Sequence, residues 1–236
     1  QFLLALLAYN ETALETCFLP YLLYWQFFYK QARHPAHINL YLRHFLSPLH
    51  KVDIPCSHIL HIEFEAKHSV KFDYFICLLG GIHKLSNNTP PMIAYAEIPN
   101  KNSYFSKEIE RFVKFHKIEN FQMNPHFPIN TLTMQRGAVV AEEKGILMDY
   151  IDVMAKGMWE ERINLGDKDI LIDYLNKNGL EGSDIIEQTS NDAIKQKLIK
   201  NTEEAVAMGA FGVPTFFIDK QMFWGKEALR EMPDYF

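Results

Sequence analysis

The side chains that most often carry redox or metal chemistry are sparse in this chain. Its cysteines form neither a C-x-x-C redox pair nor a zinc cluster nor a disulfide framework; they are Cys17, Cys56 and Cys77. Such cysteine usage is typical of a reducing compartment. The pairs His34/His37 and His58/His61 have the spacing of one helical face, but no acidic or cysteine partner accompanies them, so no metal site is predicted.

A helix start offers a different kind of chemistry. Ser47 stands directly before Pro48, which places a capping hydroxyl ahead of a proline at the first helical position. Backbone N–H groups and the positive end of the helix dipole gather at such a start, and they favour a nearby negative charge such as a thiolate. The alternative is that Ser47 is only an N-cap.

Composition excludes several classes of protein. The chain has 236 residues, of which 48% are hydrophobic and 14% aromatic, so it can bury a core and most of it is not disordered. Its net charge of −5 argues against a general binder of nucleic-acid phosphates. No basic segment precedes the first apolar run, and residues 13–29 contain Glu15, Pro20 and Gln26. We therefore expect a cytoplasmic protein without a secretory signal or membrane span.

The elements that must position a site follow a recognisable order. Alternating apolar residues predict a strand over residues 37–45, and a second strand is expected over residues 69–79, ending at Gly80-Gly81. Residues 86–102 are rich in Asn and Pro and are expected to form a loop. Helical spacing dominates from residue 105 to 208. A hairpin over residues 215–224 and a last helix after Gly225 complete the chain.

A β-α-β unit and a β-β-α unit separated by helices make up an α/β, thioredoxin-like fold with a helical insertion. We therefore predict a thioredoxin-like domain formed by residues 37–85 and 190–236 and a helical insertion domain at residues 86–189. Residues 1–36 are assigned to an N-terminal extension.

Five motifs carry a resemblance to a known family. GVPT at residues 212–215, before an apolar strand, resembles the cis-proline turn of thioredoxin-fold proteins. Such a turn opens the backbone of the preceding residue, here Val213, to pairing with an extended peptide. The other motifs are LLGGIHK at 78–84 with Asn88, HFPINTL at 126–132, NTEEA at 201–205 and FWG at 223–225. Over residues 67–236 the chain resembles 2-hydroxychromene-2-carboxylate isomerase, a glutathione-dependent enzyme related to the kappa-class glutathione transferases.

The resemblance implies a glutathione site and names its residues. Ser47 would stabilise the glutathione thiolate, and the backbone at Val213 and Pro214 would hold the cysteine part of the tripeptide. The remaining implied contacts are Lys226 and Glu227 with the γ-glutamyl end and Lys84 and Asn88 with the substrate. On the residues alone, Asn88 can equally serve a turn and the Lys226–Glu227 pair a solvated helix start; Asn130 is expected to cap a helix and Cys77 to be buried.

The implied activity is a glutathione-dependent isomerisation. It would interconvert 2-hydroxychromene-2-carboxylate and trans-o-hydroxybenzylidenepyruvate-type aromatic catabolites by reversible addition of the thiolate, with glutathione and a small aromatic carboxylate as partners. Homodimers are common among such relatives. Three alternatives stay open: a kappa-like glutathione transferase or peroxidase, a DsbA-like dithiol oxidoreductase, and a non-catalytic thioredoxin-fold binding module.

Overall fold

The computed structural model describes residues 42–46, 64–225 and 228–235. For residues 42–46 it describes the strand but not the side chains. All of these residues belong to one compact unit, Leu40–Phe236. The predicted start of the first strand at residues 37–41, the helix expected after Pro48 and the residues Ser47, Lys226 and Glu227 lie outside the described part of the chain.

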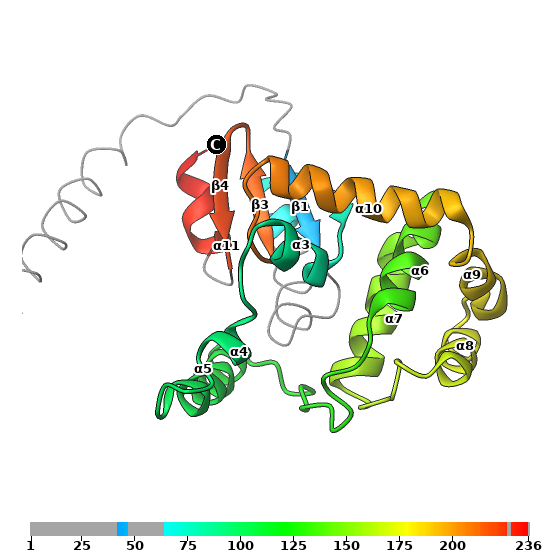
Figure 1. Cartoon of the computed structure of the whole chain (residues 1–236), viewed down its shortest axis with the longest axis horizontal. Helices are drawn as coiled ribbons and strands as arrows, with labels where there is room; N and C mark the ends of the chain where they lie inside the picture. The colour runs from blue at the N-terminus through cyan, green and yellow to red at the C-terminus, as the bar shows by residue number, and fades with distance from the viewer. Residues whose placement is uncertain (1–41, 47–63, 226–227, 236) are drawn as a thin grey trace, which may run out of the picture. The chain divides into compact units, whose positions relative to one another are not determined.

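A four-stranded mixed sheet with the order β2-β1-β3-β4 forms the centre of this unit (Figure 1). β1 pairs in parallel with β2, with Leu46 opposite Ile76, and antiparallel with β3, with Phe45 opposite Thr215. β3 and β4 form an antiparallel hairpin. The strands are β1 (Leu42–Leu46), β2 (Phe72–Ile76), β3 (Thr215–Ile218) and β4 (Gln221–Trp224).

Most helices fall between β2 and β3 in the sequence. They are α3 (Leu79–Leu85), α4 (Pro91–Ala94), α5 (Lys101–Phe115), α6 (Leu132–Glu143), α7 (Leu147–Trp159), α8 (Lys168–Lys177), α9 (Gly182–Gln188) and α10 (Asp192–Ala207). α11 (Ala228–Glu231) and a short 3-10 helix (Met232–Tyr235) follow the hairpin. This order matches the predicted thioredoxin-like fold; the predicted domain boundaries stay a prediction.

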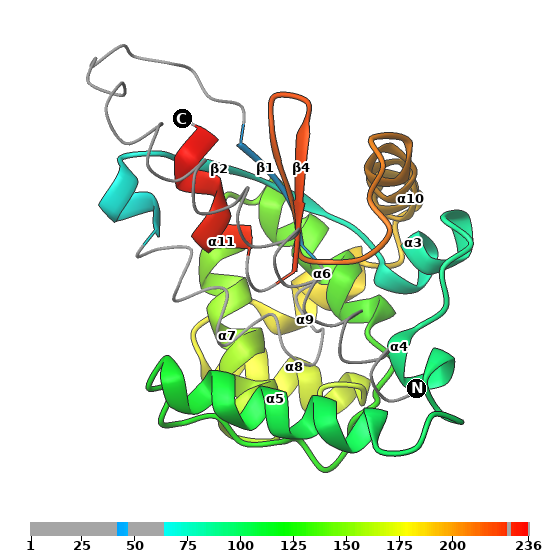
Figure 2. The same cartoon turned by 90° about the vertical axis from the view of Figure 1, so that its left-hand side faces the viewer.

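Both faces of the sheet are covered. Successive side chains of β3 point to opposite sides, and each side packs against a different cluster. Phe216 packs with Phe223 and Met232 on the α11 side, whereas Phe217 packs with Ile82 of α3 and Ala205 of α10 on the other. Every residue of β3 is buried as a result, as in strands covered on both faces. Figures 1 and 2 both show α11 on one side of the strands and α10 on the other.

α10 links the sheet to the other helices. Its residues Ile194 and Leu198 belong to the core that α6, α7, α8 and α9 share, whereas Ala205 belongs to the cluster beneath β3. Figure 1 shows α10 extending from the strands to α6 and α9. Side-chain caps mark the starts of α8 and α10. Asp167 accepts hydrogen bonds from the backbone of Asp169 and Ile170, and Asn191 accepts one from Ala193.

The sequence prediction was wrong about the end of the second strand. β2 ends at Ile76 and α3 begins at Leu79, so Gly80 and Gly81 lie inside a helix rather than at a strand end. The reason is a tertiary contact, because a methyl group on Gly81 would lie 2.9 Å from Cγ2 of Thr202 in α10. Only glycine lets α3 approach α10 this closely. The expected loop over residues 86–102 also contains α4 and the beginning of α5.

Candidate functional site

The predicted proline turn lies at the start of β3, and its conformation is confirmed. The Val213–Pro214 peptide bond is cis. The Val213 side chain is buried in the cluster between α3, α10 and β3, which leaves the whole residue 5% exposed. No hydrogen bond with a described residue engages the backbone N–H or C=O of Val213. These two groups are free to pair with an extended ligand.

Three hydrogen bonds hold the residues on either side of Val213. The Asn88 side chain donates to the carbonyl of Phe211 over 2.8 Å, and the buried Thr215 hydroxyl donates to the carbonyl of Gly212 over 2.7 Å. On the far side, the N–H of Gly225 donates to the carbonyl of Pro214 over 3.0 Å. The turn is therefore held by the segment after α3, by β3 and by the residue after β4, without a contribution from a ligand.

Asn88 lies beside this turn, and its hydrogen bonds show which of its groups remain available. Its backbone N–H donates to the carbonyl of His83 at 2.9 Å, which continues the chain from α3 into the turn at Asn87. One N–H of its side-chain amide is used by the carbonyl of Phe211, so the second N–H and the side-chain oxygen are the groups left for a substrate. The structure brings Asn88 and the Val213 turn together, as a shared site requires.

Lys84 lies in the last turn of α3, four residues before Asn88. Its side chain is exposed and forms no ion pair with a described residue. It carries a positive charge that a carboxylate can reach from solvent. The remaining implied site residues, Ser47, Lys226 and Glu227, lie outside the described residues, and their roles stay predictions.

Two neighbouring residues of α10 have structural roles that the motif alone did not reveal. Asn201 donates to the carbonyl of Ile76 at 3.0 Å, where β2 ends. The Thr202 hydroxyl accepts a hydrogen bond from the N–H of Leu78 at 3.0 Å and donates to the carbonyl of Leu198 at 2.7 Å. Together they satisfy the backbone between β2 and α3 and so fix α3, which carries Lys84 and leads to Asn88. Backbone groups left by a strand end need such partners.

Two further expectations from the sequence are confirmed. Asn130 has a capping role, because its side-chain oxygen accepts from the N–H of Leu132 at 3.0 Å. Cys77 is fully buried one residue beyond β2, and burial raises the pKa of its thiol. Burial and a raised pKa are both typical of a structural core cysteine. A second cis bond, between Phe127 and Pro128, was not predicted.

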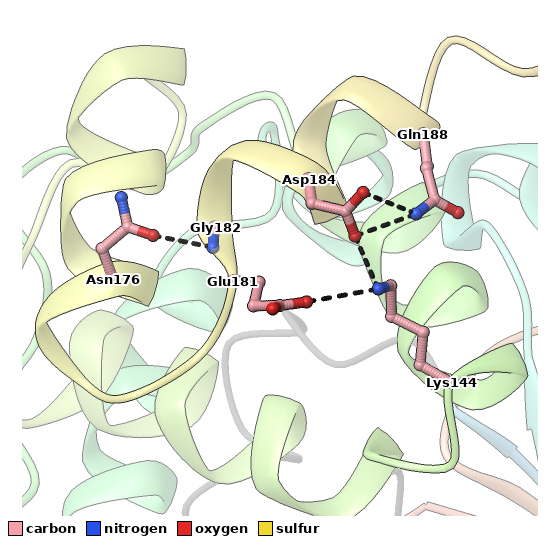
Figure 3. Close-up of polar contacts among 6 residues, drawn as sticks. All are labelled: Lys144, Asn176, Glu181, Gly182, Asp184 and Gln188. Atoms are coloured by element: carbon pink, nitrogen blue, oxygen red, sulfur yellow. Dashed lines mark hydrogen bonds and ion pairs between the residues drawn. The ribbon is translucent and has the colours of Figure 1, made fainter.

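Polar side chains also gather where α6 ends and α9 begins (Figure 3). Lys144 forms ion pairs with Asp184 and, at 3.5 Å, with Glu181. Asp184 also accepts hydrogen bonds from Gln188 at 2.9 and 3.0 Å, while Asn176 accepts one from the N–H of Gly182 at 2.8 Å. The hydrogen bond from Lys144, followed by those from Gln188, lowers the pKa of Asp184. The charges satisfy one another, so this cluster joins helices rather than binding a ligand.

Among the described residues, no group of three or more His, Cys, Asp or Glu side chains is placed to hold a metal ion. The helices in the same ranges include none that is both long and apolar enough to span a bilayer. The histidine pairs before residue 64 lie outside these ranges.

Comparison with known proteins bears on both fold and family. The DSBA-like thioredoxin domain matches residues 57–236. Glutathione S-transferase kappa 1 of Rattus norvegicus is 26% identical over 157 residues, which span 62% of this chain and 67% of the rat protein.

Two solved structures share the fold. A 2-hydroxychromene-2-carboxylate isomerase superposes with a TM-score of 0.69 at 18% identity, over 81% of this chain and 92% of that one. The cytosolic disulfide reductase DsbM from Pseudomonas aeruginosa, solved with glutathione, superposes with a TM-score of 0.53 at 12% identity, over 83% and 95% of the two chains. The resemblance inferred from the motifs is therefore confirmed, and the chain belongs to the DSBA-like thioredoxin domain family.

Proposed function

We propose that this protein is a glutathione-dependent isomerase. It interconverts 2-hydroxychromene-2-carboxylate and trans-o-hydroxybenzylidenepyruvate-type aromatic catabolites. When bound, glutathione supplies a thiolate that adds reversibly to the conjugated double bond, so that this bond can rotate before the thiolate leaves again. No net oxidation occurs, and glutathione is regenerated. The reaction therefore needs no redox-active cysteine or metal from the protein.

The observation that carries the proposal is the unpaired backbone of Val213 in a turn that is already fixed. Its N–H and C=O match the complementary groups of a cysteine residue in a tripeptide, which would pair as a short added strand. Because Asn88, Thr215 and Gly225 order the turn beforehand, binding costs little conformational entropy. The relatives support glutathione as the ligand, since the rat protein is a glutathione S-transferase and DsbM was solved with glutathione.

We assign the other contacts as follows. Ser47 and the helix start predicted at Pro48 would stabilise the thiolate, because hydrogen-bond donors and a helix N-terminus favour negative charge. Lys226 and Glu227 hold the charged γ-glutamyl end. Lys84 attracts the substrate carboxylate, and the side-chain oxygen of Asn88 accepts a hydrogen bond from the substrate hydroxyl.

Two alternatives within this fold remain candidates. A kappa-like transferase would release a stable glutathione conjugate, and the rat relative favours it. A dithiol oxidoreductase is disfavoured because the chain has no C-x-x-C pair and its one described cysteine, Cys77, is buried with a raised pKa.

We also propose a homodimer, supported by exposed apolar side chains on α4 and α5. Ile93 is 68% and Phe115 79% exposed, and α5 buries Phe112 alone. Large exposed apolar side chains on successive helices are typical of association surfaces. Sedimentation velocity tests this point: the wild type is expected to sediment as a dimer and Phe115→Glu to shift toward monomer. A wild type that sediments as a monomer at all concentrations would refute it.

Turnover and adduct formation test the proposed reaction together. We expect the wild type with glutathione to change the absorbance of 2-hydroxychromene-2-carboxylate, and Ser47→Ala to lose most of this activity. Ser190→Ala, which removes an exposed hydroxyl after α9, serves as the control. Labelled glutathione should stay unconjugated. A stable labelled adduct would favour the transferase, and full activity of Ser47→Ala would show that the role assigned to Ser47 is wrong.

A further inference from the structure

Two aromatic rings flank the Val213 turn. Phe211 and Trp224 have ring centroids 5.1 Å apart with their planes inclined by 49°. Trp224 is the last residue of β4 and is 51% exposed, whereas Trp159 is fully buried in the helical core. Trp224 therefore presents part of its surface to solvent beside the Val213 turn, which makes it a candidate contact surface.

The backbone beneath the indole is shaped to hold it in place. A methyl group on Gly212 would lie 2.7 Å from Nε1 of Trp224, so any larger residue would displace the ring. The hydrogen bond from Asn88 fixes the carbonyl of Phe211, and that from Thr215 fixes the carbonyl of Gly212. The two rings are therefore held by the same contacts that order Val213, which is the residue after Gly212.

We propose that Trp224, supported by Phe211, binds the aromatic ring of the substrate and so determines the preference for aromatic over aliphatic acceptors. This inference rests on the proposed function, because it places the acceptor beside a thiol held at Val213. A flat ring can stack on the exposed indole face, and stacked or edge-on aromatic pairs are favoured beyond their buried area. The side chains of Phe211 and Trp224 are uncharged, so they contribute to the choice of acceptor rather than to the addition of the thiolate.

Binding of an unreactive substrate analogue tests the proposal without turnover. 3-(2-Hydroxyphenyl)propanoate keeps the ring and carboxylate but lacks the double bond, and pentanoate lacks the ring as well. Both are titrated into wild type, Trp224→Phe and Trp224→Leu in the presence of glutathione, by calorimetry and by tryptophan fluorescence. Subtracting the Trp224→Phe signal isolates the emission of Trp224. Glutathione affinity is measured separately for each protein.

We expect the phenolic acid to quench Trp224 and to bind Trp224→Leu roughly three- to tenfold more weakly than wild type. Trp224→Phe should retain most of the affinity, while pentanoate and glutathione should bind all three proteins equally. Unchanged affinity of Trp224→Leu for the phenolic acid would overturn the inference. So would an equal loss of glutathione binding, which would show that Trp224 only supports the turn, or quenching that depends on protein concentration alone, which would show that a second copy covers it. Failure of the wild type to bind glutathione would instead refute the proposed function.

Discussion

The side-chain amide of Asn88 donates a hydrogen bond to the backbone carbonyl of Phe211 over 2.8 Å, across 123 residues of sequence. This bond ties the segment after α3 to the turn that contains Val213 and Pro214. An exposed asparagine in a proline-rich segment usually serves its own turn. Here it links the segment after α3 to the turn before β3, where the candidate ligand would bind.

Loss of the Asn88 amide should weaken glutathione binding. In Asn88→Ala the carbonyl of Phe211 loses its donor, and the turn must then be ordered at the expense of binding free energy. One neutral hydrogen bond contributes about 0.5–1.5 kcal/mol, which corresponds to a loss of affinity of roughly two- to tenfold. Isothermal titration calorimetry measures it. Asn176→Ala is the control, because it also removes an asparagine bond to the backbone, at Gly182, and should leave the affinity unchanged.

Thr202→Val should destabilise the protein, although valine and threonine have nearly the same shape. Valine preserves the volume of threonine but leaves the N–H of Leu78 without its acceptor at a position where Thr202 is 4% exposed. An unsatisfied buried group of this kind costs about 1–3 kcal/mol. Urea unfolding followed by circular dichroism gives the free energy of unfolding.

Thr189→Val provides the matched control for that substitution. The Thr189 hydroxyl is also buried, but the bond recorded for it is a donation to the carbonyl of Ile186, so its loss orphans no N–H group. We expect a smaller cost than for Thr202→Val. An equal loss of unfolding free energy in the two variants would mean that the unpaired N–H of Leu78 is not the cause of the destabilisation.

The two glycines of α3 should respond to alanine in opposite directions. At Gly80 a methyl group would meet nothing within 4 Å, and alanine should stabilise the helix by about 0.5–1 kcal/mol. At Gly81 it would meet Cγ2 of Thr202 at 2.9 Å, and overpacking of this kind costs about 1–3 kcal/mol. Thermal or urea unfolding distinguishes them.

A second substitution tests the stated cause. Thr202→Ser removes the methyl group but keeps the hydroxyl that accepts from Leu78, so it should relieve part of the cost of Gly81→Ala. If the double variant is no more stable than Gly81→Ala alone, the contact with Thr202 is not the reason for glycine at this position.

The ion pair between Lys144 and Asp184 predicts that the stability of the fold depends on pH. Hydrogen bonds from Lys144 and Gln188 lower the pKa of Asp184 below its usual value of 3.8. A carboxyl whose folded-state pKa is depressed stabilises the protein above its unfolded-state pKa and loses this effect as the pH falls through the folded-state value. Lys144→Met should therefore lower the urea midpoint at neutral pH, and the difference from wild type should shrink below pH 3.8.

The size of that difference is expected to be small, because both side chains reach solvent. In the Asp184→Asn background, Lys144→Met should have less effect at neutral pH, with only the pairing to Glu181 left to lose. A difference that stays constant down to the acid limit would show that Lys144 acts through packing rather than through charge.

Periodicity and turn chemistry predicted much of the fold. The hairpin follows from an apolar run, a turn at Asp219 and a second short strand, and the helices between β2 and β3 follow from helical spacing. These are local features. The position of Gly81 inside a helix and the hydrogen bond between Leu78 and Thr202, 124 residues apart, depend on how α3 crosses α10. No local pattern encodes that crossing.

The candidate site divides in the same way. The turn at Val213 and Pro214 was predicted from a short motif, because its conformation is largely local. The bond between Asn88 and Phe211 and the closeness of Gly212 to the indole of Trp224 become visible only when distant segments pack together. Resemblance named Asn88 as a site residue without revealing that its amide already donates one hydrogen bond to Phe211.

The ionisation of bound glutathione tests the central claim most directly. The thiolate absorbs near the ultraviolet edge where the thiol does not, so a pH titration of the wild type with and without glutathione reports the thiol pKa in the complex. We predict saturable binding and a pKa well below that of free glutathione, with the shift reduced in Ser47→Ala. Absence of binding at millimolar glutathione, or bound glutathione with the pKa of the free tripeptide, would contradict the account.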